Sequence, residues 1–121
     1  MLNLSSIMVG SADPKKLGEF YQKVLGQKPT WEDGEWIGFQ VGSCHLTIGP
    51  HSDIKGKSKE PARLMLNLET KNVKGEFERI QKLGAKVIAK PYTVEGMEGD
   101  IATFADPDGN YFQLMSPYEV K

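Results

Sequence analysis

Four side chains at matched positions in the two halves of this chain could do chemistry: Ser6, His45, Met65 and Gln113. Among these residue types, only histidine has a reference pKa near neutral, so His45 could serve as a general base or as a metal ligand. The serine hydroxyl, the thioether and the neutral amide carry no negative charge to offset the loss of a divalent cation's water shell. The set therefore predicts neither a bound metal nor another cofactor. It leaves His45 as the one candidate base if the protein is an enzyme.

Two tryptophans, Trp31 and Trp36, flank an Asp33-Gly34 hairpin signal and offer large flat faces on which a planar ligand could stack. Trp36 alternates with Ile37, so either side chain could instead belong to the core. Acidic residues gather at this hairpin and at a loop of the second half: Glu32, Asp33, Glu35, Glu95, Glu98 and Asp100. Such a rim favours a cationic ligand, whereas the simpler interpretation is a set of solvated carboxylates.

A repeated tripeptide indicates how these side chains are positioned. Gly-Glu-Phe occurs at residues 18–20 and again at 75–77, and Leu-Gly follows each copy within two turns of helix. A short apolar run precedes each copy, at 4–9 and at 64–68. The chain is therefore predicted to be one β-α-β-β-β unit used twice, with module one at about 1–50, a linker at about 49–61 and module two at about 62–121.

Each module is predicted to contain one amphipathic helix. Asp13 and Asn72 are N-cap residues, Pro14 suits the first helical position, and Gly26 and Gly84 suit the two helix ends. The apolar stripes recur at three- and four-residue steps: Leu17, Phe20, Tyr21, Val24 and Leu25 in the first helix, and Val73, Phe77, Ile80 and Leu83 in the second. Each helix should therefore cover one face of a sheet.

Strand alternation assigns the faces of the predicted strands. Ile7 and Val9 should face the helix, which leaves Ser6 and Met8 on the opposite face. The same alternation places Met65 and Asn67, His45 and Gln113 on the face away from the helices, and it turns Cys44 toward the core. The repeat maps Ser6 onto Met65 and His45 onto Gln113, so the predicted ligand cavity is lined by Ser6, Trp31, Trp36, His45, Met65, Asn67 and Gln113.

Composition excludes several classes of function. The 121 residues predict one domain, and 15 basic against 16 acidic residues create no strong field for nucleic acid or an anionic membrane. No apolar run is long enough to span a bilayer. The N-terminus lacks the pattern of a signal peptide, and the single cysteine cannot form an internal disulfide, so we expect a cytoplasmic protein.

The helix pattern Asp13…Phe20-Tyr21…Leu25-Gly26, the final turn at 106–110 (Asp-Pro-Asp-Gly-Asn) and the paired units together resemble the vicinal oxygen chelate superfamily. That superfamily includes glyoxalase I, extradiol dioxygenases, fosfomycin-resistance enzymes and bleomycin-resistance proteins. The resemblance implies an α+β fold in which two tandem βαβββ modules form a cupped mixed β-sheet with the helices outside. It also implies a homodimer, and it places the family's metal-ligand positions at Ser6, His45, Met65 and Gln113.

Three functions remain open on these grounds. The first is a small-molecule-binding protein without the usual metal site, similar to the antibiotic-resistance branch that sequesters an aromatic, cationic drug. The second is a glyoxalase-like lyase, an isomerase or a dioxygenase-like enzyme with a degenerate or displaced metal site, which would use His45 as its base. The third is a regulatory module that binds a metabolite and reports through a dimer interface.

Overall fold

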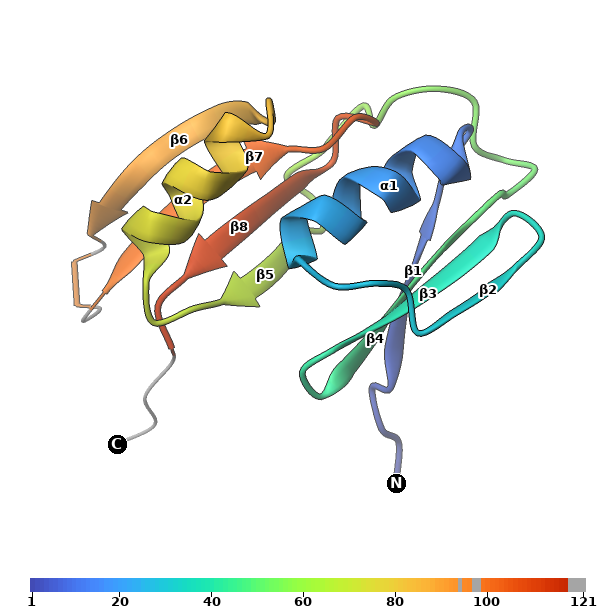
Figure 1. Ribbon diagram of the computed structural model, residues 1–121, viewed down its shortest axis with the longest axis horizontal. Coiled ribbons are helices and arrows are strands. Elements are labelled where there is room, and N and C mark those ends of the chain that lie inside the picture. Colours follow the sequence, from blue (N-terminus) through green and yellow to red (C-terminus); the bar gives the residue numbers. More distant parts are fainter. Residues whose placement is uncertain (94, 97–98, 118–121) are drawn as a thin grey trace. The chain divides into compact units, whose positions relative to one another are not determined.

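The computed structural model describes residues 1–93, 95–96 and 99–117. The chain divides into two compact units, Met1–Gly56 and Lys57–Lys121, which we call unit 1 and unit 2. Their boundary falls inside the segment 49–61 that the sequence marks as a linker. Both units have the β-α-β-β-β order predicted for the repeated half (Figure 1).

Unit 1 is a four-stranded mixed sheet with one helix on one face. Its elements are β1 (Ser6–Gly10), α1 (Pro14–Leu25), β2 (Trp31–Asp33), β3 (Trp36–Val41) and β4 (Cys44–Gly49). The strand order is β1-β4-β3-β2, in which β1 runs parallel to β4 and the other pairs are antiparallel. The core lies between α1 and the sheet and contains Leu17, Tyr21, Val24, Phe39, Leu46 and Ile48.

Unit 2 repeats this topology. Its elements are β5 (Leu66–Glu69), α2 (Val73–Lys82), β6 (Lys86–Thr93), β7 (Asp100–Ala105) and β8 (Tyr111–Met115), and the strand order is β5-β8-β7-β6. Phe104 lies in the centre of the core, with its ring stacked 5.1 Å from that of Phe77 and 5.5 Å from that of Phe112. The two stacks join α2 to the two central strands, because Phe77 belongs to the helix and the others to β7 and β8.

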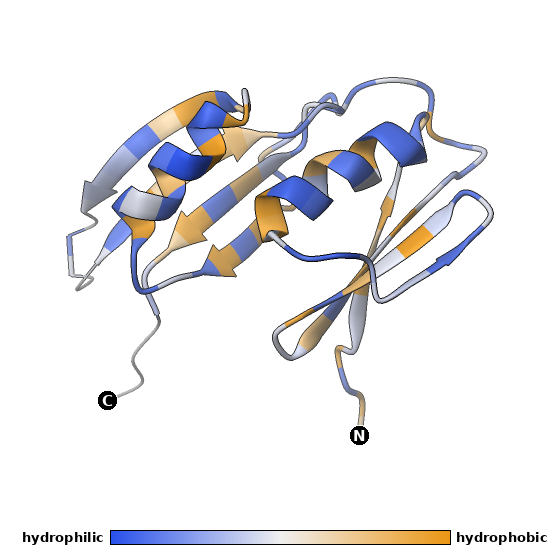
Figure 2. Cartoon of the chain, in the orientation of Figure 1, coloured by the Kyte–Doolittle hydropathy of each residue, from blue (hydrophilic) through white to orange (hydrophobic). Residues whose placement is uncertain are grey.

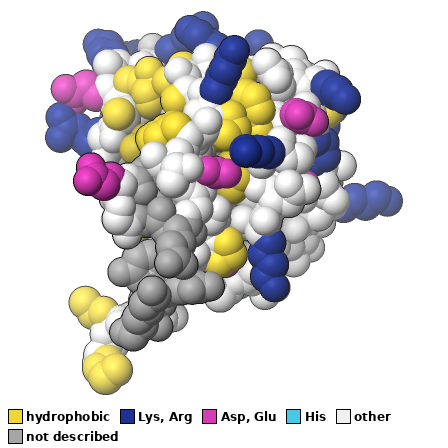
Figure 3. All heavy atoms as spheres, turned by 90° about the vertical axis from the view of Figure 1, so that its left-hand side faces the viewer, with side chains coloured by type: hydrophobic (Ala, Val, Ile, Leu, Met, Phe, Trp, Pro, Cys, Tyr) yellow, Lys and Arg dark blue, Asp and Glu magenta, His cyan; other side chains and the backbone are white. Residues whose placement is uncertain are grey.

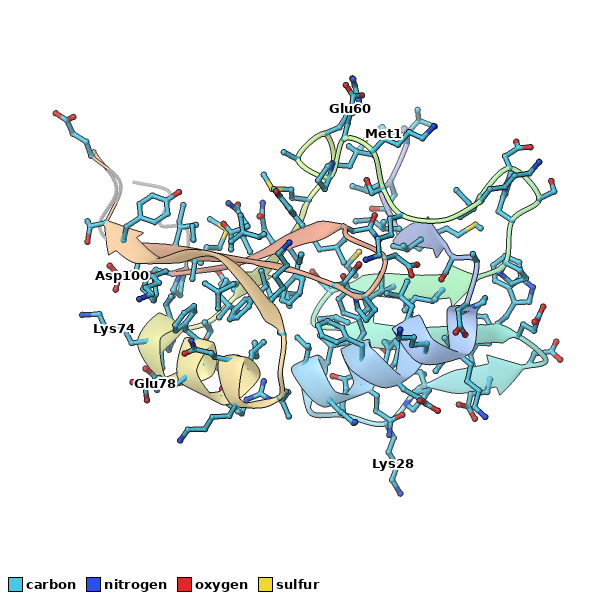
Figure 4. All side chains as sticks on the ribbon, turned by 90° about the horizontal axis from the view of Figure 1, so that it is seen from above. Met1, Lys28, Glu60, Lys74, Glu78 and Asp100 are labelled. Carbon is cyan, nitrogen blue, oxygen red and sulfur yellow. The ribbon has the colours of Figure 1, made fainter. Side chains whose placement is uncertain are left out.

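The helices begin and end where local chemistry predicts. The Asp13 carboxylate accepts a hydrogen bond from the Lys16 N–H, and the Asn72 side chain accepts one from the Gly75 N–H. Gly26 caps α1 in the left-handed region at φ 66°. Hydrophilic and hydrophobic residues alternate along both helices (Figure 2). Lys74 and Glu78 are exposed and project outward from α2 (Figure 4).

Three details differ from the predictions. The first strand begins at Ser6, so the apolar Leu4 before it is exposed. The strand expected at 86–89 continues to Thr93 through two register shifts against β7. Leu83 belongs to the predicted stripe but is 44% exposed, because it follows the last turn of α2.

Apolar side chains also lie among lysines and carboxylates on the side of unit 2 that carries α2 and β6 (Figure 3).

The turn between β7 and β8 is held by one buried carboxylate. Asp106 is 5% exposed and accepts hydrogen bonds from the Asp108 and Asn110 N–H groups and from the Asn110 side-chain amide. The same turn holds the start of unit 2, because the Ser58 N–H donates to the Asp108 carbonyl at 2.9 Å. The predicted turn at 106–110 thus forms, and it reaches beyond its own hairpin.

Candidate site on the open face of unit 1

The two faces of the unit 1 sheet are distinguished by what covers them. Ile37 faces α1, because a Cβ added at Gly18 of that helix would lie 3.0 Å from the Ile37 Cγ2 atom. Residues that alternate with Ile37 on β3 therefore point to the opposite face, which α1 leaves uncovered. We call this second surface the open face of unit 1.

Ser6 and His45 are direct neighbours on the open face. They are register partners in the parallel pairing of β1 with β4, and Gln40 is the partner of His45 on the other side. All three side chains are exposed. They therefore form a polar row across three strands, with the imidazole in the middle.

Both tryptophans also belong to the open face. Trp31 is the register partner of Gly38, and Trp36 has the same strand parity as Gly38 and Gln40. Trp31 is 43% exposed, and Trp36 is half-buried. Of the two alternatives that the sequence left open, Ile37 faces the core and Trp36 does not. Trp36 also lines, with residues of α1, a cavity of about 470 Å³ beside the β2–β3 hairpin.

The strands of unit 1 place a carboxylate but no lysine or arginine side chain on the open face. None of the four strands of unit 1 contains a lysine or an arginine. Asp33 is the register partner of Trp36 and is exposed, whereas Glu32 pairs with Ile37 and points to the other face. The predicted acidic rim is thus divided between two faces, and Asp33 is its member beside the tryptophans. Glu98, which the sequence placed in the same rim, lies outside the described residues.

Unit 2 has its own polar pair on the face away from α2. Asn67 and Gln113 are register partners in the parallel pairing of β5 with β8. The Gln113 Nε2 donates to the Thr103 Oγ1 at 3.1 Å, and Thr103 is only 5% exposed. This bond orients the amide of Gln113. Met65 lies just before β5 and is 37% exposed.

The predicted equivalence of His45 and Gln113 is wrong by two residues along the strand. The first strands leave their sheets through matching hydrogen bonds, from the Ser11 N–H to the Gly49 carbonyl and from the Thr70 N–H to the Met115 carbonyl. Counted back from these bonds, Gln113 corresponds to Thr47, and His45 corresponds to Tyr111. The mapping of Ser6 onto Met65 agrees with the same bonds. The error arises because equivalent residues of the last strands, such as Gly49 and Met115, are 66 positions apart in the sequence. Equivalent residues after the first strands, Ser11 and Thr70, are only 59 positions apart.

The side chains of Ser6, His45, Met65 and Gln113, where the resemblance placed the family's metal ligands, do not fit a divalent metal, and Thr47, the structural counterpart of Gln113, would add only a hydroxyl. A hydroxyl, an imidazole, a thioether and a neutral amide provide one good ligand and no anionic charge. Within the described part of the chain, no three residues of the types His, Cys, Asp and Glu gather in a way that could hold a metal ion.

Alternation along a strand placed Met8 on the open face, and it could have identified Gln40 and Thr47 as two further residues of that face. All three share the parity of the predicted residues but are not among the residues predicted to line the cavity. Gly38 and Gly49 could not be found in this way, because their importance depends on a side chain from a neighbouring strand.

In the described part of the chain, no helix has the length and the hydrophobicity that a membrane span requires.

Comparisons with known proteins agree with the architecture of each unit. A family model described as "Glyoxalase-like domain" matches residues 6–115. The comparison with curated protein sequences found no match. Among solved structures, the chain is similar to a glyoxalase-related enzyme from Fulvimarina pelagi, with 18% identity, coverage of 97% of this chain and 89% of that chain, and a TM-score of 0.80.

Two similar structures come from proteins connected with antibiotics. One is an antibiotic-binding protein from Streptomyces sp. CB03234, with 24% identity, coverage of 98% of both chains and a TM-score of 0.76. The other is a fosfomycin resistance protein from Listeria monocytogenes, with 17% identity, coverage of 98% and 93%, and a TM-score of 0.68. At these identities the likeness concerns the fold. Because the family model spans nearly all of both units, the chain belongs to the glyoxalase-like domain family and thereby to the vicinal oxygen chelate superfamily.

Proposed function

We propose that this protein binds a planar, cationic organic molecule on the open face of unit 1 without the help of a metal ion. The observation that carries the proposal is the position of Trp31, Trp36 and Asp33 on one face whose strands contain no lysine or arginine. Indole rings stack on planar ligands, and a cation gains further from an aromatic face and from a nearby carboxylate.

Polar groups beside the tryptophans would orient the ligand. The row of Ser6, His45 and Gln40 offers hydroxyl, imidazole and amide groups on the same face. The sequence-based proposal also names Met65, Asn67 and Gln113, all in unit 2, as ligand-binding residues. Small-molecule sites commonly combine apolar and aromatic walls with a few such polar groups.

The similar antibiotic-binding protein and fosfomycin resistance protein support a small-molecule ligand, and an antibiotic is one candidate. We further propose that the protein is cytoplasmic and forms a homodimer. Light scattering at several concentrations tests the dimer directly.

A second candidate is a metal-free lyase or isomerase. One observation favours it: His45 is exposed on the same face as the tryptophans and is the register partner of Ser6, whose side chain carries a hydroxyl. His45 would then remove a proton from a ligand held on the indole rings. A His45→Ala variant that converts a discovered substrate at the wild-type rate would contradict this second candidate.

Tryptophan fluorescence during titration with planar cationic antibiotics tests the main proposal. We expect binding to quench the emission, because a stacked ligand contacts the indole rings. Calorimetry should then show that Trp31→Ala and Trp36→Ala each weaken binding by roughly 1–3 kcal/mol, a stacking-scale loss. Tyr92→Ala, which removes an exposed aromatic ring of unit 2, is the matched control and should bind like wild type. Unchanged affinity in both tryptophan variants would remove the open face from the site.

A further inference from the structure

Two glycines in the strands of unit 1 lie directly beneath the two tryptophans. A Cβ added at Gly38 would lie 2.1 Å from the Nε1 and 2.3 Å from the Cε2 atom of Trp31. A Cβ added at Gly49 would lie 2.2, 2.4 and 2.5 Å from the Cε3, Cζ3 and Cδ2 atoms of Trp36. These three atoms are bonded in sequence, and their nearly equal distances mean that the face of the ring covers Gly49. Both glycines are buried although they belong to the open face.

The two indole rings are neighbours on the sheet. Gly38 on β3 is the register partner of Thr47 on β4, and Gly49 lies two residues farther along β4. Such diagonal neighbours in an antiparallel pair are roughly 7–8 Å apart. The rings that cover the two glycines therefore lie side by side, and Trp31 keeps nearly half of its surface exposed.

A side chain at either glycine would displace the ring above it. Cβ atoms essentially never approach another heavy atom within the distances found here, so an alanine methyl and the indole could not share the space. Neither glycine has a positive φ, so the backbone itself would accept alanine. The absence of a side chain at these two positions thus serves the packing of the rings.

We propose that Gly38 and Gly49 are seats that hold Trp31 and Trp36 against the sheet as one double-ring floor, and that this floor selects cations with several fused rings over single-ring cations. The proposal rests on the binding function proposed above and adds the class of ligand. A fused planar system can contact both indole rings at once, whereas a single ring can stack on only one of them. Asp33, the register partner of Trp36, would lie beside the positive charge of either ligand.

The test compares proflavine, a cation with three fused rings, with benzamidine, a cation with one ring. We expect wild-type protein to bind proflavine about tenfold more tightly, and Gly38→Ala to weaken proflavine binding about five- to tenfold while benzamidine changes less than about twofold. Gly10→Ala is the matched control, because it is another strand glycine of the same face, and its added methyl would lie nearest to the side chains of Ile54 and His51. Equal affinity of wild type for both cations would overturn the selectivity.

A measurement without ligand tests the seat separately. In a Trp36→Phe background Trp31 is the one tryptophan, and adding Gly38→Ala should increase acrylamide quenching of its emission and weaken its near-ultraviolet circular dichroism. Unchanged signals would overturn the seat. Altered signals in a protein that binds no planar cation would support the seat and contradict the proposed function. If Gly38→Ala does not fold, Gly49→Ala in a Trp31→Phe background gives the same comparison for Trp36.

Discussion

Asp33 lies opposite Trp36 in the antiparallel pairing of β2 with β3, and both residues belong to the face that α1 leaves uncovered. Its neighbour Glu32 points to the other face, since it pairs with the core-facing Ile37. Two adjacent carboxylates of one short strand therefore have different surroundings. This arrangement allows the contribution of a carboxylate on the open face to ligand affinity to be separated from that of the net negative charge of the protein.

Asp33→Asn should weaken the binding of a planar cation by about two- to fivefold, the range of an exposed ion pair. The loss should shrink as the salt concentration rises, because salt screens exposed charges. Glu32→Gln, which removes the same charge from the opposite face, should change affinity less. Calorimetric titrations at low and high salt provide the comparison, and equal losses for the two variants would argue against a specific role for Asp33.

Titration with Ni²⁺, Mn²⁺ or Fe²⁺ should reveal no stoichiometric site of micromolar affinity. The reason is the donor set that the resemblance implied, in which His45 is accompanied by Ser6, Met65 and Gln113 and by no carboxylate. Elemental analysis of the purified protein provides a second measurement. One bound ion per chain that disappears in His45→Ala would establish a metal site that we do not expect.

Phe104→Ala should lower the free energy of unfolding by about 3–5 kcal/mol, because the ring is fully buried and stacks on Phe77 and on Phe112. Tyr92→Ala, at an aromatic residue that is 47% exposed in the same unit, should change stability by less than about 1 kcal/mol. Urea denaturation measures both values. A small effect of Phe104→Ala would mean that the core of unit 2 rearranges to fill the space.

Asp13→Ala should destabilise unit 1 by about 1 kcal/mol, since it removes the acceptor for the Lys16 N–H at the start of α1. Asn72→Ala should have a similar effect on unit 2 through the Gly75 N–H. Asp53→Ala, an exposed aspartate outside any helix, is a suitable control. Thermal denaturation monitored by circular dichroism would contradict the assignment of Asp13 if the control and the cap variant melted alike.

Asp106→Ala should lower the free energy of unfolding by about 1–3 kcal/mol, because it leaves the N–H groups of Asp108 and Asn110 without their carboxylate acceptor in a half-buried turn. Asp106→Asn, which keeps one acceptor oxygen, should cost less. Denaturant titration measures the two losses. Equal losses would show that the negative charge, and not the hydrogen bonds, stabilises the turn.

Local chemistry made much of the fold predictable. A cap residue, a stripe at three- and four-residue steps and a glycine at the end define each helix without any distant partner, and α1 and α2 begin where Asp13 and Asn72 predict. Strand alternation was equally sufficient for the faces of β1, since Ser6 pairs with the exposed His45 and Ile7 pairs with Leu46, which belongs to the core beneath α1. The core of each unit follows from these local patterns.

The candidate site was less predictable, because it depends on register between strands that are far apart in the sequence. The equivalence of His45 and Gln113 failed because the chain between the first and the last strand is longer in unit 2 than in unit 1. Gly38 and Gly49 carry no signal of their own, since an unremarkable glycine acquires meaning only when a neighbouring strand places an indole above it.

The hydrogen bond from Ser58 to the turn at 106–110 also bears on where the chain can be cut. A fragment designed to begin at the first residue of β5 would discard a segment that is already fastened to the far hairpin of the same unit. Expression of the C-terminal half should therefore start at Lys57, and a permuted or split version of the protein should have its new ends before that residue.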